Sequence, residues 1–182
     1  MSPNALANSA GIATLEVAID AVPESRSAPN RALAFQAAYR AEWVPVFRFA
    51  LAWTNDWAAA EDLAQEAFFR LWHRRHSVDW DEPSLPWLIA TTRNLATDRF
   101  RRLRRLAGME PQRSESIEHS GIEGWLDVQA AFGRLSRLER TAVVLVAVHG
   151  FDSEETARLL GSTSGAVRAA VRRAREKLES ER

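Results

Sequence analysis

The segment "AEDLAQEAFFRLW", residues 60–72, has the apolar spacing of an amphipathic α-helix. On a helical wheel, one side of this helix carries Leu63, Ala64, Ala67 and Leu71. The opposite side carries Asp62, Gln65, Glu66 and Phe69, flanked by Trp72. A helix face that meets only water has no need of a phenylalanine beside its carboxylates. We therefore expect the first side to pack in a core and the second to bind a partner.

Helical patterning also precedes this segment. From Arg31 to Ala50, apolar residues recur at three- and four-residue steps, and Pro45 marks either a kink or a helix start. Asn55 and Asp56 are candidate N-caps for the helix that contains residues 60–72.

A third helix is predicted after a loop at residues 76–86, which contains Trp80. Its sequence, "WLIATTRNLATDRFRRLRR" (87–105), starts directly after Pro86. We expect its packing side chains to be Trp87, Leu88, Leu95 and Phe100.

The remaining pattern divides the chain. Residues 106–123 contain two glycines and a proline but no apolar period, which is typical of a linker. When extended, these residues span at most roughly 60 Å. Residues 1–30 lack a sustained period and are expected to be a disordered extension. No β-alternation persists, so the expected fold is all-α: two small helical domains, residues 31–105 and 124–182, joined by a flexible linker. In the second domain, two helices are expected to meet near residues 135–138.

Charge is distributed unevenly along a chain whose formal net charge is zero. Residues 56–82 carry a net charge of −4, residues 93–105 carry +5 and residues 168–177 carry +4. Two basic stripes and one acidic stripe indicate surfaces for different partners.

Several chemistries are excluded or unsupported. The absence of cysteine excludes disulfides and thiolate metal sites. His73 and His76 form a possible metal pair, but no third ligand has a persuasive spacing, so we expect no metal and no cofactor. No catalytic set is recognisable, so the protein is not expected to be an enzyme. No signal peptide or membrane-spanning segment is evident, so we expect a cytoplasmic protein without membrane insertion.

The segment "FDSEETARLLGSTSGAVRAAVRRAR" (151–175) has the pattern of a helix-turn-helix. Asp152 and Glu155 form a capping-box pair, Gly161 suits the turn, and Thr163 can cap the second helix. Ala157 and Val167 would pack the two helices together. In such a motif the second helix enters the major groove, which makes DNA-contact candidates of Ser164, Gly165, Arg168, Arg172 and Arg173. The alternative is an ordinary helical hairpin with a solvated arginine face.

The helix at 87–105 offers a second nucleic-acid surface. Arginines bind phosphate, and Asn and Thr can reach base edges. The candidates are Arg93, Asn94, Thr97, Asp98, Arg101 and Arg102. Trp80 could stack on an unpaired base for roughly 1–3 kcal/mol. The alternative is a solvated basic helix end with cations at its favourable C-terminus.

Three of these segments together resemble bacterial RNA polymerase sigma factors of the extracytoplasmic-function class. "AEDLAQEAFFRLW" resembles the family's core-binding helix, "PWLIATTRNLATDRFRR" its promoter-melting helix, and residues 151–175 its helix-turn-helix. The three motifs occur in the family's order and separation. The resemblance covers about 31–105 and 124–182.

The resemblance implies specific roles. Asp62, Gln65 and Glu66, with Phe69 and Trp72 as apolar neighbours, would dock on a coiled coil of the polymerase beta-prime subunit. Asn94, Asp98 and the 76–86 loop would bind the minus-ten promoter element. The minus-thirty-five element would be read by Thr163, Ser164, Gly165, Arg168 and Arg172. The implied partners are core RNA polymerase, through its beta-prime and beta subunits, promoter DNA, and an anti-sigma factor.

This chain departs from the family pattern at four positions. Ala169 and Ala170 replace residues that are often polar in the recognition helix, so base readout would shift to Arg168 and Arg172. Ser162 replaces a usual aliphatic residue. Asp98 stands where some relatives carry Asn, so the minus-ten preference does not transfer.

Two functions therefore compete. In the first, the chain is an alternative sigma factor that directs promoter recognition, promoter melting and transcription initiation. In the second, it is a stand-alone helix-turn-helix repressor or activator, which would act as a dimer on a palindromic site.

Overall fold

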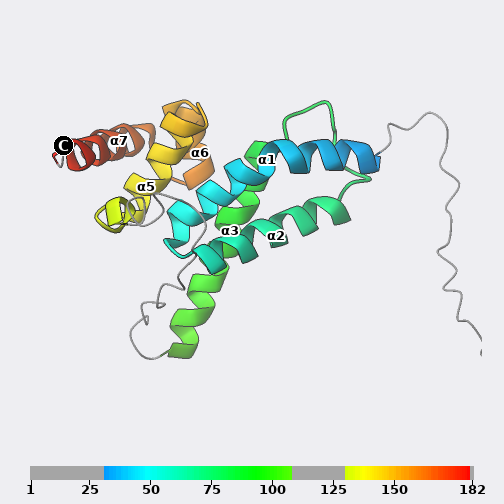
Figure 1. Ribbon diagram of the computed structural model, residues 1–182, viewed down its shortest axis with the longest axis horizontal. Coiled ribbons are helices and arrows are strands. Elements are labelled where there is room, and N and C mark those ends of the chain that lie inside the picture. Colours follow the sequence, from blue (N-terminus) through cyan, green and yellow to red (C-terminus); the bar gives the residue numbers. More distant parts are fainter. Residues whose placement is uncertain (1–30, 108–129, 181–182) are drawn as a thin grey trace, which may run out of the picture.

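The computed structural model describes residues 31–107 and 130–180, and all their regular structure is helical (Figure 1). The elements are α1 (Arg31–Thr54), α2 (Trp57–His73), α3 (Leu85–Ala107), α5 (Arg137–Val143), the π-helical turn η1 (Val144–Val148), α6 (Ser153–Leu160) and α7 (Ser164–Glu179). The predicted all-α class is confirmed. The predicted disordered extension at 1–30, and all but the first two residues of the predicted linker, lie outside the described residues.

Helices α1, α2 and α3 form an N-terminal unit. The four small and aliphatic residues predicted to face the core from α2 are all buried, and Phe68 joins them. All of them except Leu63 pack with Val46 of α1 and Leu88 of α3 in one cluster, against which Trp87 and Leu95 also pack. Leu63 belongs to a second cluster, with Ala50 and Leu51 of α1. Burying one such large apolar side chain contributes roughly 1.5–3 kcal/mol, so α2 is held mainly by this stripe.

The turn from α1 to α2 uses both predicted capping residues, in different roles. Asp56 is the N-cap of α2, because its side chain accepts a hydrogen bond of 2.8 Å from the Ala59 N–H. Asn55 instead adopts a left-handed conformation with φ 56°, which asparagine tolerates better than most residues. Pro45 lies inside α1 rather than at its start.

The C-terminal unit comprises residues 130–180. Residues 130–133 are helical, and the chain turns before Ser136, as predicted for two helices meeting near 135–138. Ser136 and Glu139 form a reciprocal capping box at the start of α5. The helix then widens into η1, where the His149 N–H reaches the Val144 carbonyl at 3.0 Å.

The helix-turn-helix has the predicted local structure. The side chain of Asp152 accepts hydrogen bonds from the N–H groups of Glu154 and Glu155, and Gly161 closes α6 with φ 64°. Thr163 caps α7 by accepting from the Ala166 N–H. Ala157 and Val167 pack together with Ala142 and Ala170 in the core of this unit.

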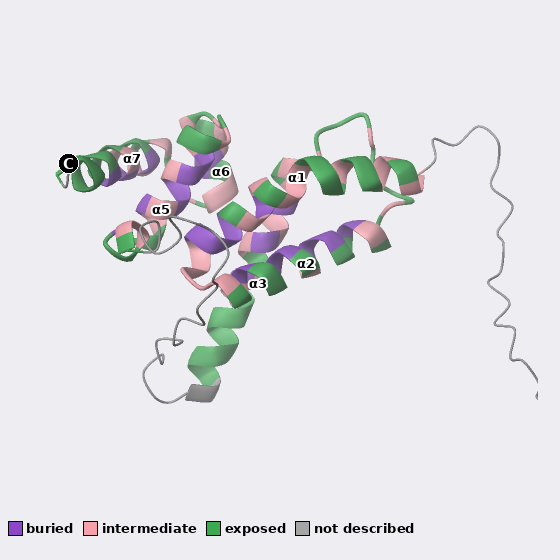
Figure 2. Cartoon of the chain, viewed as in Figure 1, coloured by how far each residue is buried: buried purple, intermediate pink, exposed green. Residues whose placement is uncertain are grey.

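The two units also pack directly against each other, which the sequence patterns did not predict. Phe49 of α1, Ile89 of α3 and Leu145 of η1 are fully buried in one shared cluster. Figure 2 shows buried segments where the two units meet, whereas the C-terminal half of α3 is exposed.

Candidate functional site

The acidic and aromatic face of α2 is open to solvent. Asp62 and Gln65 are exposed and Glu66 is partly buried. Glu66 accepts a hydrogen bond of 2.8 Å from Arg70, and Asp62 accepts one of 3.1 Å from Arg99 of α3. Exposed ion pairs of this kind contribute about 0–1 kcal/mol, so both carboxylates can exchange these arginines for the basic groups of a partner.

Phe69 and Trp72 have different surroundings. The Phe69 side chain is 58% exposed, and its ring centroid lies 4.1 Å from that of the His73 imidazole. The Trp72 ring is partly buried, 5.0 Å from the ring of Phe35 and 4.2 Å from the Arg75 guanidinium carbon. Phe69 therefore presents an apolar surface to solvent, whereas Trp72 packs within the N-terminal unit, and contact of either ring with the polymerase stays a prediction.

A groove of about 410 Å³ runs between α2 and α3 beside this face. It brings Asn94, a predicted minus-ten residue, next to Glu66 and Phe69, two predicted polymerase-contact residues. The other lining residues are Arg70, His73, Arg74, Trp87 and Thr91. The sequence reasoning did not assign Arg70, Arg74 or Thr91 to a site. Helical spacing could have indicated them, since Thr91 shares a face with Trp87 and Asn94.

The basic face of α3 is split between two environments. Asp98, Arg101 and Arg102 lie on its exposed C-terminal half, where Asp98 and Arg101 approach to 3.7 Å. Arg93 is partly buried, and its Nη1 donates to the Leu159 carbonyl of α6 at 3.0 Å. The Thr97 hydroxyl donates to the Arg93 carbonyl, one turn back along α3.

The prediction that Phe100 packs in the core is wrong. Its side chain is 41% exposed. The C-terminal half of α3 extends beyond the helices that cover its first half, so this position has no core to enter (Figure 1). The ring instead lies within 5.6–5.8 Å of the guanidinium carbons of Arg104 and Arg137.

Trp80 is tied into the loop that precedes α3. Its ring is partly buried against the first core cluster, and its Nε1 donates to the Arg75 carbonyl at 3.2 Å. Stacking of this ring on an unpaired base stays a prediction.

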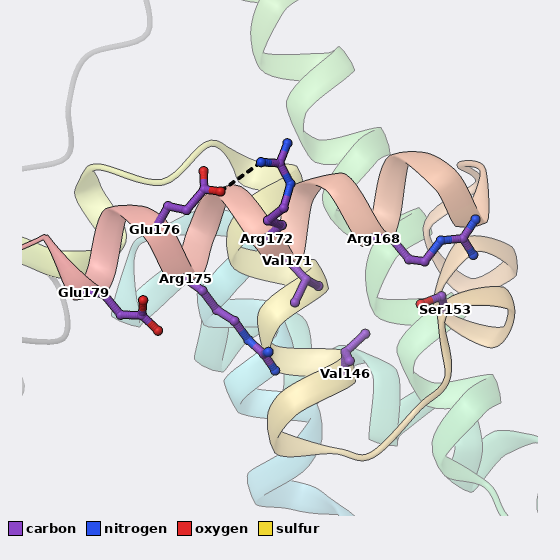
Figure 3. Close-up of a pocket in the computed structure, with 8 residues that line it drawn as sticks. All are labelled: Val146, Ser153, Arg168, Val171, Arg172, Arg175, Glu176 and Glu179. Carbon is purple, nitrogen blue, oxygen red and sulfur yellow. Dashed lines mark hydrogen bonds and ion pairs between the residues drawn. The ribbon is translucent and has the colours of Figure 1, made fainter.

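The exposed side of α7 forms a second groove, of about 360 Å³ (Figure 3). Arg168, Arg172 and Arg175 line it, together with Val146, Ser153, Val171, Glu176 and Glu179. In Figure 3, Arg168 and Arg175 extend along the side of Ser153 and Val146, whereas Arg172 pairs with Glu176 at 2.8 Å. The sequence reasoning did not assign Arg175 to this site, although the spacing 168, 172, 175 places all three arginines on one helix face.

The remaining predicted residues of the helix-turn-helix differ in exposure. Thr163 and Gly165 are exposed at the start of α7, and Ser164 is partly buried. Arg173 points to another part of the unit, where it donates to the Glu139 carboxylate at 3.1 Å.

Glu139 is a buried carboxylate of the C-terminal unit whose pKa is strongly lowered. Burial alone would raise its pKa, but hydrogen bonds from Lys177, the Ser136 N–H and Arg173 outweigh this and lower the pKa to about 2. The carboxylate is thus held ionised, linking α5 to α7. In the exposed cap of α6, the hydrogen bond from the Glu155 N–H lowers the pKa of Asp152.

Among the described residues, no group of three or more His, Cys, Asp or Glu side chains could hold a metal ion. Within residues 31–107 and 130–180, no helix is long and apolar enough to cross a membrane.

Comparison with known families assigns both units. The family model "Sigma-70 region 2" matches residues 38–106, and "Sigma-70, region 4" matches residues 125–178. The ECF RNA polymerase sigma factor EcfG of Rhodopseudomonas palustris is 30% identical over 147 residues, which are 75% of this chain and 79% of that protein. The chain belongs to the sigma-70 family. Its relatives place it among the extracytoplasmic-function sigma factors.

Two further proteins show the extent of the likeness. The "Probable RNA polymerase sigma factor RfaY" of Xanthomonas campestris is 36% identical over 151 residues; the match covers 75% of this chain but only 37% of that protein. The sigma factor RpoE of Bartonella quintana, solved in complex with the anti-sigma factor NepR, has a TM-score of 0.64 and 25% identity. That match covers 80% of this chain and 94% of the solved one.

These matches bear on the competing function. They cover regions 2 and 4 in the family's order, rather than the helix-turn-helix alone. A stand-alone repressor or activator is therefore not favoured.

Proposed function

We propose that this chain is an alternative sigma factor that binds core RNA polymerase and directs promoter recognition, promoter melting and transcription initiation. The observation that supports the proposal is the presence, in one chain, of an acidic and aromatic exposed face on α2 and of arginine-bearing faces on α3 and α7. The protein acts in the cytoplasm and contributes binding energy rather than catalysis. An anti-sigma factor, of the kind bound to the Bartonella protein, is its proposed regulator.

Each face is assigned its own binding partner. Asp62, Gln65, Glu66 and Phe69, with Trp72 at the edge, bind the polymerase. The α3 residues Asn94, Thr97, Asp98, Arg101 and Arg102, with Arg93 and Trp80, bind the minus-ten region, and region 4 binds the minus-thirty-five region through α7. Each DNA contact alone is small, so a polymerase that holds both units in place raises their joint affinity through effective concentration.

The α2 face is tested by the double variant Asp62→Ala plus Glu66→Ala. We expect core-polymerase affinity to fall at least tenfold, about 1.4 kcal/mol, because two carboxylates lose their basic partners. The measurement is titration of labelled protein with core polymerase, followed by transcript-start mapping on genomic fragments.

The matched control is Glu154→Ala plus Glu179→Ala, which removes two exposed carboxylates from the C-terminal unit. It should bind core polymerase like the wild type. Wild-type protein that neither binds core polymerase nor yields new transcript starts would disprove the proposal.

A further inference from the structure

The start of α3 is held by a carboxylate that belongs to another helix. Ser84 directly precedes α3, and its carbonyl accepts the first hydrogen bond of the helix, from the Leu88 N–H at 3.0 Å. The Ser84 hydroxyl donates to Oε2 of Glu42 on α1 at 2.5 Å. Because Glu42 and Ser84 are 42 residues apart in the chain, this hydrogen bond joins two helices rather than closing a local turn.

The backbone at the start of α3 faces the same carboxylate. Burial raises the pKa of Glu42, although hydrogen bonds from the Ser84 hydroxyl and from the backbone N–H groups of Leu85 and Ser84 oppose the rise. The first N–H groups of a helix have no partner inside it and carry partial positive charge, so a carboxylate is a suitable acceptor for them. The first turn of α3 has no acidic residue of its own. Glu42 therefore caps α3 from α1.

Glu42 also attaches the end of the 76–86 loop to α1. Earlier in the loop, the Trp80 Nε1 donates to the Arg75 carbonyl at 3.2 Å, only five residues back in the chain. That hydrogen bond closes the loop on itself and does not reach α1. The bond from Ser84 to Glu42 does reach α1, at the point where the loop becomes α3.

Apolar packing fixes the chain on both sides of this junction. Before it, Val78 and Trp80 of the loop pack against the first core cluster. After it, Leu88 and Ile89 of α3 are fully buried. Between these anchors, residues 81–83 are exposed, so the polar contact with α1 sets the point at which the chain enters α3.

The junction lies between two residues that the proposed function assigns to the minus-ten element. Trp80 precedes the cap, and Asn94 follows it, roughly 14 Å along α3 from Leu85 at about 1.5 Å per residue. Both residues are assigned to one element, so their placement relative to each other matters. Loss of the cap would free the path of the loop, and with it Trp80, while the buried side chains of α3 keep Asn94 in place.

We propose that Glu42 is a positioning residue for promoter melting: by capping α3 from α1, it holds the 76–86 loop and the minus-ten face of α3 in one fixed arrangement. Glu42 itself contacts no DNA in this role. The effect on melting rests on the proposed function, whereas the capping of α3 can be measured in the free protein.

The capping is tested by amide hydrogen exchange in the free, full-length protein. Glu42→Ala removes the acceptor, so we expect exchange of the Ser84 and Leu85 N–H groups to become about fivefold faster. Glu42→Gln keeps an acceptor oxygen and should recover most of the protection. Ser84→Ala removes the hydroxyl donor alone and should speed exchange at Leu85 by a smaller factor.

Glu154→Ala is the matched control, because it removes an exposed carboxylate from the C-terminal unit. It should leave exchange at the start of α3 unchanged. Circular dichroism checks that each variant remains helical.

The functional consequence is a difference between two affinities. Titration with core polymerase should give Glu42→Ala the wild-type affinity, because the α2 face is unchanged. The assembled complex should bind a single-stranded oligonucleotide of the minus-ten region of a mapped promoter about fivefold more weakly, since the loop and α3 no longer meet that strand in one arrangement. Glu42→Gln should recover most of this affinity, and Glu154→Ala should match the wild type in both measurements.

Unchanged exchange at the start of α3 in both Glu42→Ala and Ser84→Ala would overturn the capping. Faster exchange together with wild-type affinity for the single strand would overturn the role in melting. Equal losses of polymerase and single-strand binding, without recovery in Glu42→Gln, would indicate general destabilisation and would also refute that role. If the wild type fails to bind core polymerase, the proposed function fails instead, and the exchange rates of the free protein still decide whether Glu42 caps α3.

Discussion

At the residue scale, Glu139 illustrates how a buried charge is retained. Its carboxylate is 4% exposed, yet it accepts hydrogen bonds from the Ser136 N–H, Arg173 and Lys177. Arg173 and Lys177 belong to α7 and Glu139 to α5, so these hydrogen bonds join the two helices. Moving the helices apart would leave the buried carboxylate without its cations, and the network therefore holds α5 and α7 together. Arg173, predicted from sequence as a DNA contact, has this second role in the structure, and its contact with DNA stays a prediction.

The lowered pKa of Glu139 makes stability depend on pH. Because the folded pKa is about 2 and the ordinary value is 4.5, the stabilisation is fully present above about pH 4.5 and is lost as pH falls toward 2. Glu139→Gln should therefore lower the free energy of unfolding at pH 7 by up to about 3 kcal/mol. The difference from wild type should shrink at pH 3. Urea unfolding of both proteins at each pH measures this; Glu179→Gln, at an exposed position, is the control. A difference that does not change with pH would contradict the assignment.

Gly161 is the second position at which a single residue decides local structure. Its φ of 64° is left-handed, and a Cβ there would lie 3.0 Å from Arg93. Gly161→Ala should cost about 1–2 kcal/mol, which corresponds to a fall in Tm of roughly 2–8 °C for a chain of this size. Gly133→Ala is the control, because a Cβ at Gly133 meets nothing within 4 Å. Equal melting temperatures for the two variants would be inconsistent with strain at Gly161.

At the element scale, the features that were predicted correctly from the sequence are those set by interactions between residues close together in the chain. The buried stripe of α2, the caps of α2, α6 and α7, and the turn at Gly161 depend on residues a few positions apart, and all were predicted. Phe100 was assigned to the core because periodicity shows which side of a helix is apolar, but not how far its neighbours extend. The partnership of Arg173 with Glu139 spans 34 residues, and helical spacing carries no information about such a pair.

The exposed side of α7 yields a prediction about a whole helix face. If Arg168, Arg172 and Arg175 act together on DNA, Arg175→Ala should weaken binding of the polymerase complex to a mapped promoter. The slope of log affinity against log salt should fall by about 0.9, the value for one lost phosphate contact. Arg40→Ala removes an exposed arginine from α1 and should leave both quantities unchanged. An unaltered salt slope for Arg175→Ala would remove this residue from the DNA interface.

At the scale of the whole molecule, the cluster that the two units share could not be predicted from the sequence, for a physical reason. Phe49, Ile89 and Leu145 each continue the apolar pattern of their own segment, so each is expected to be buried, but the pattern does not identify what buries it. Only the fold places α1, α3 and η1 together. The result is a molecule whose two units stabilise one another while they are in contact.

This coupling predicts the unfolding behaviour of the free protein. Because both units lose buried apolar area when either one unfolds, we expect one cooperative thermal transition. A fluorophore on Ala58→Cys in the N-terminal unit and one on Glu154→Cys in the C-terminal unit, both at exposed positions, should therefore report the same melting temperature. Ile89→Ala removes buried volume from the shared cluster and should cost about 2–5 kcal/mol. Since Ile89 lies in the cluster that both units share, the variant should lower the melting temperature reported by both probes. Leu159→Glu, which places a carboxylate against the same cluster, should separate the two transitions. Two well-separated transitions in the wild type would mean that the two units do not share their stability.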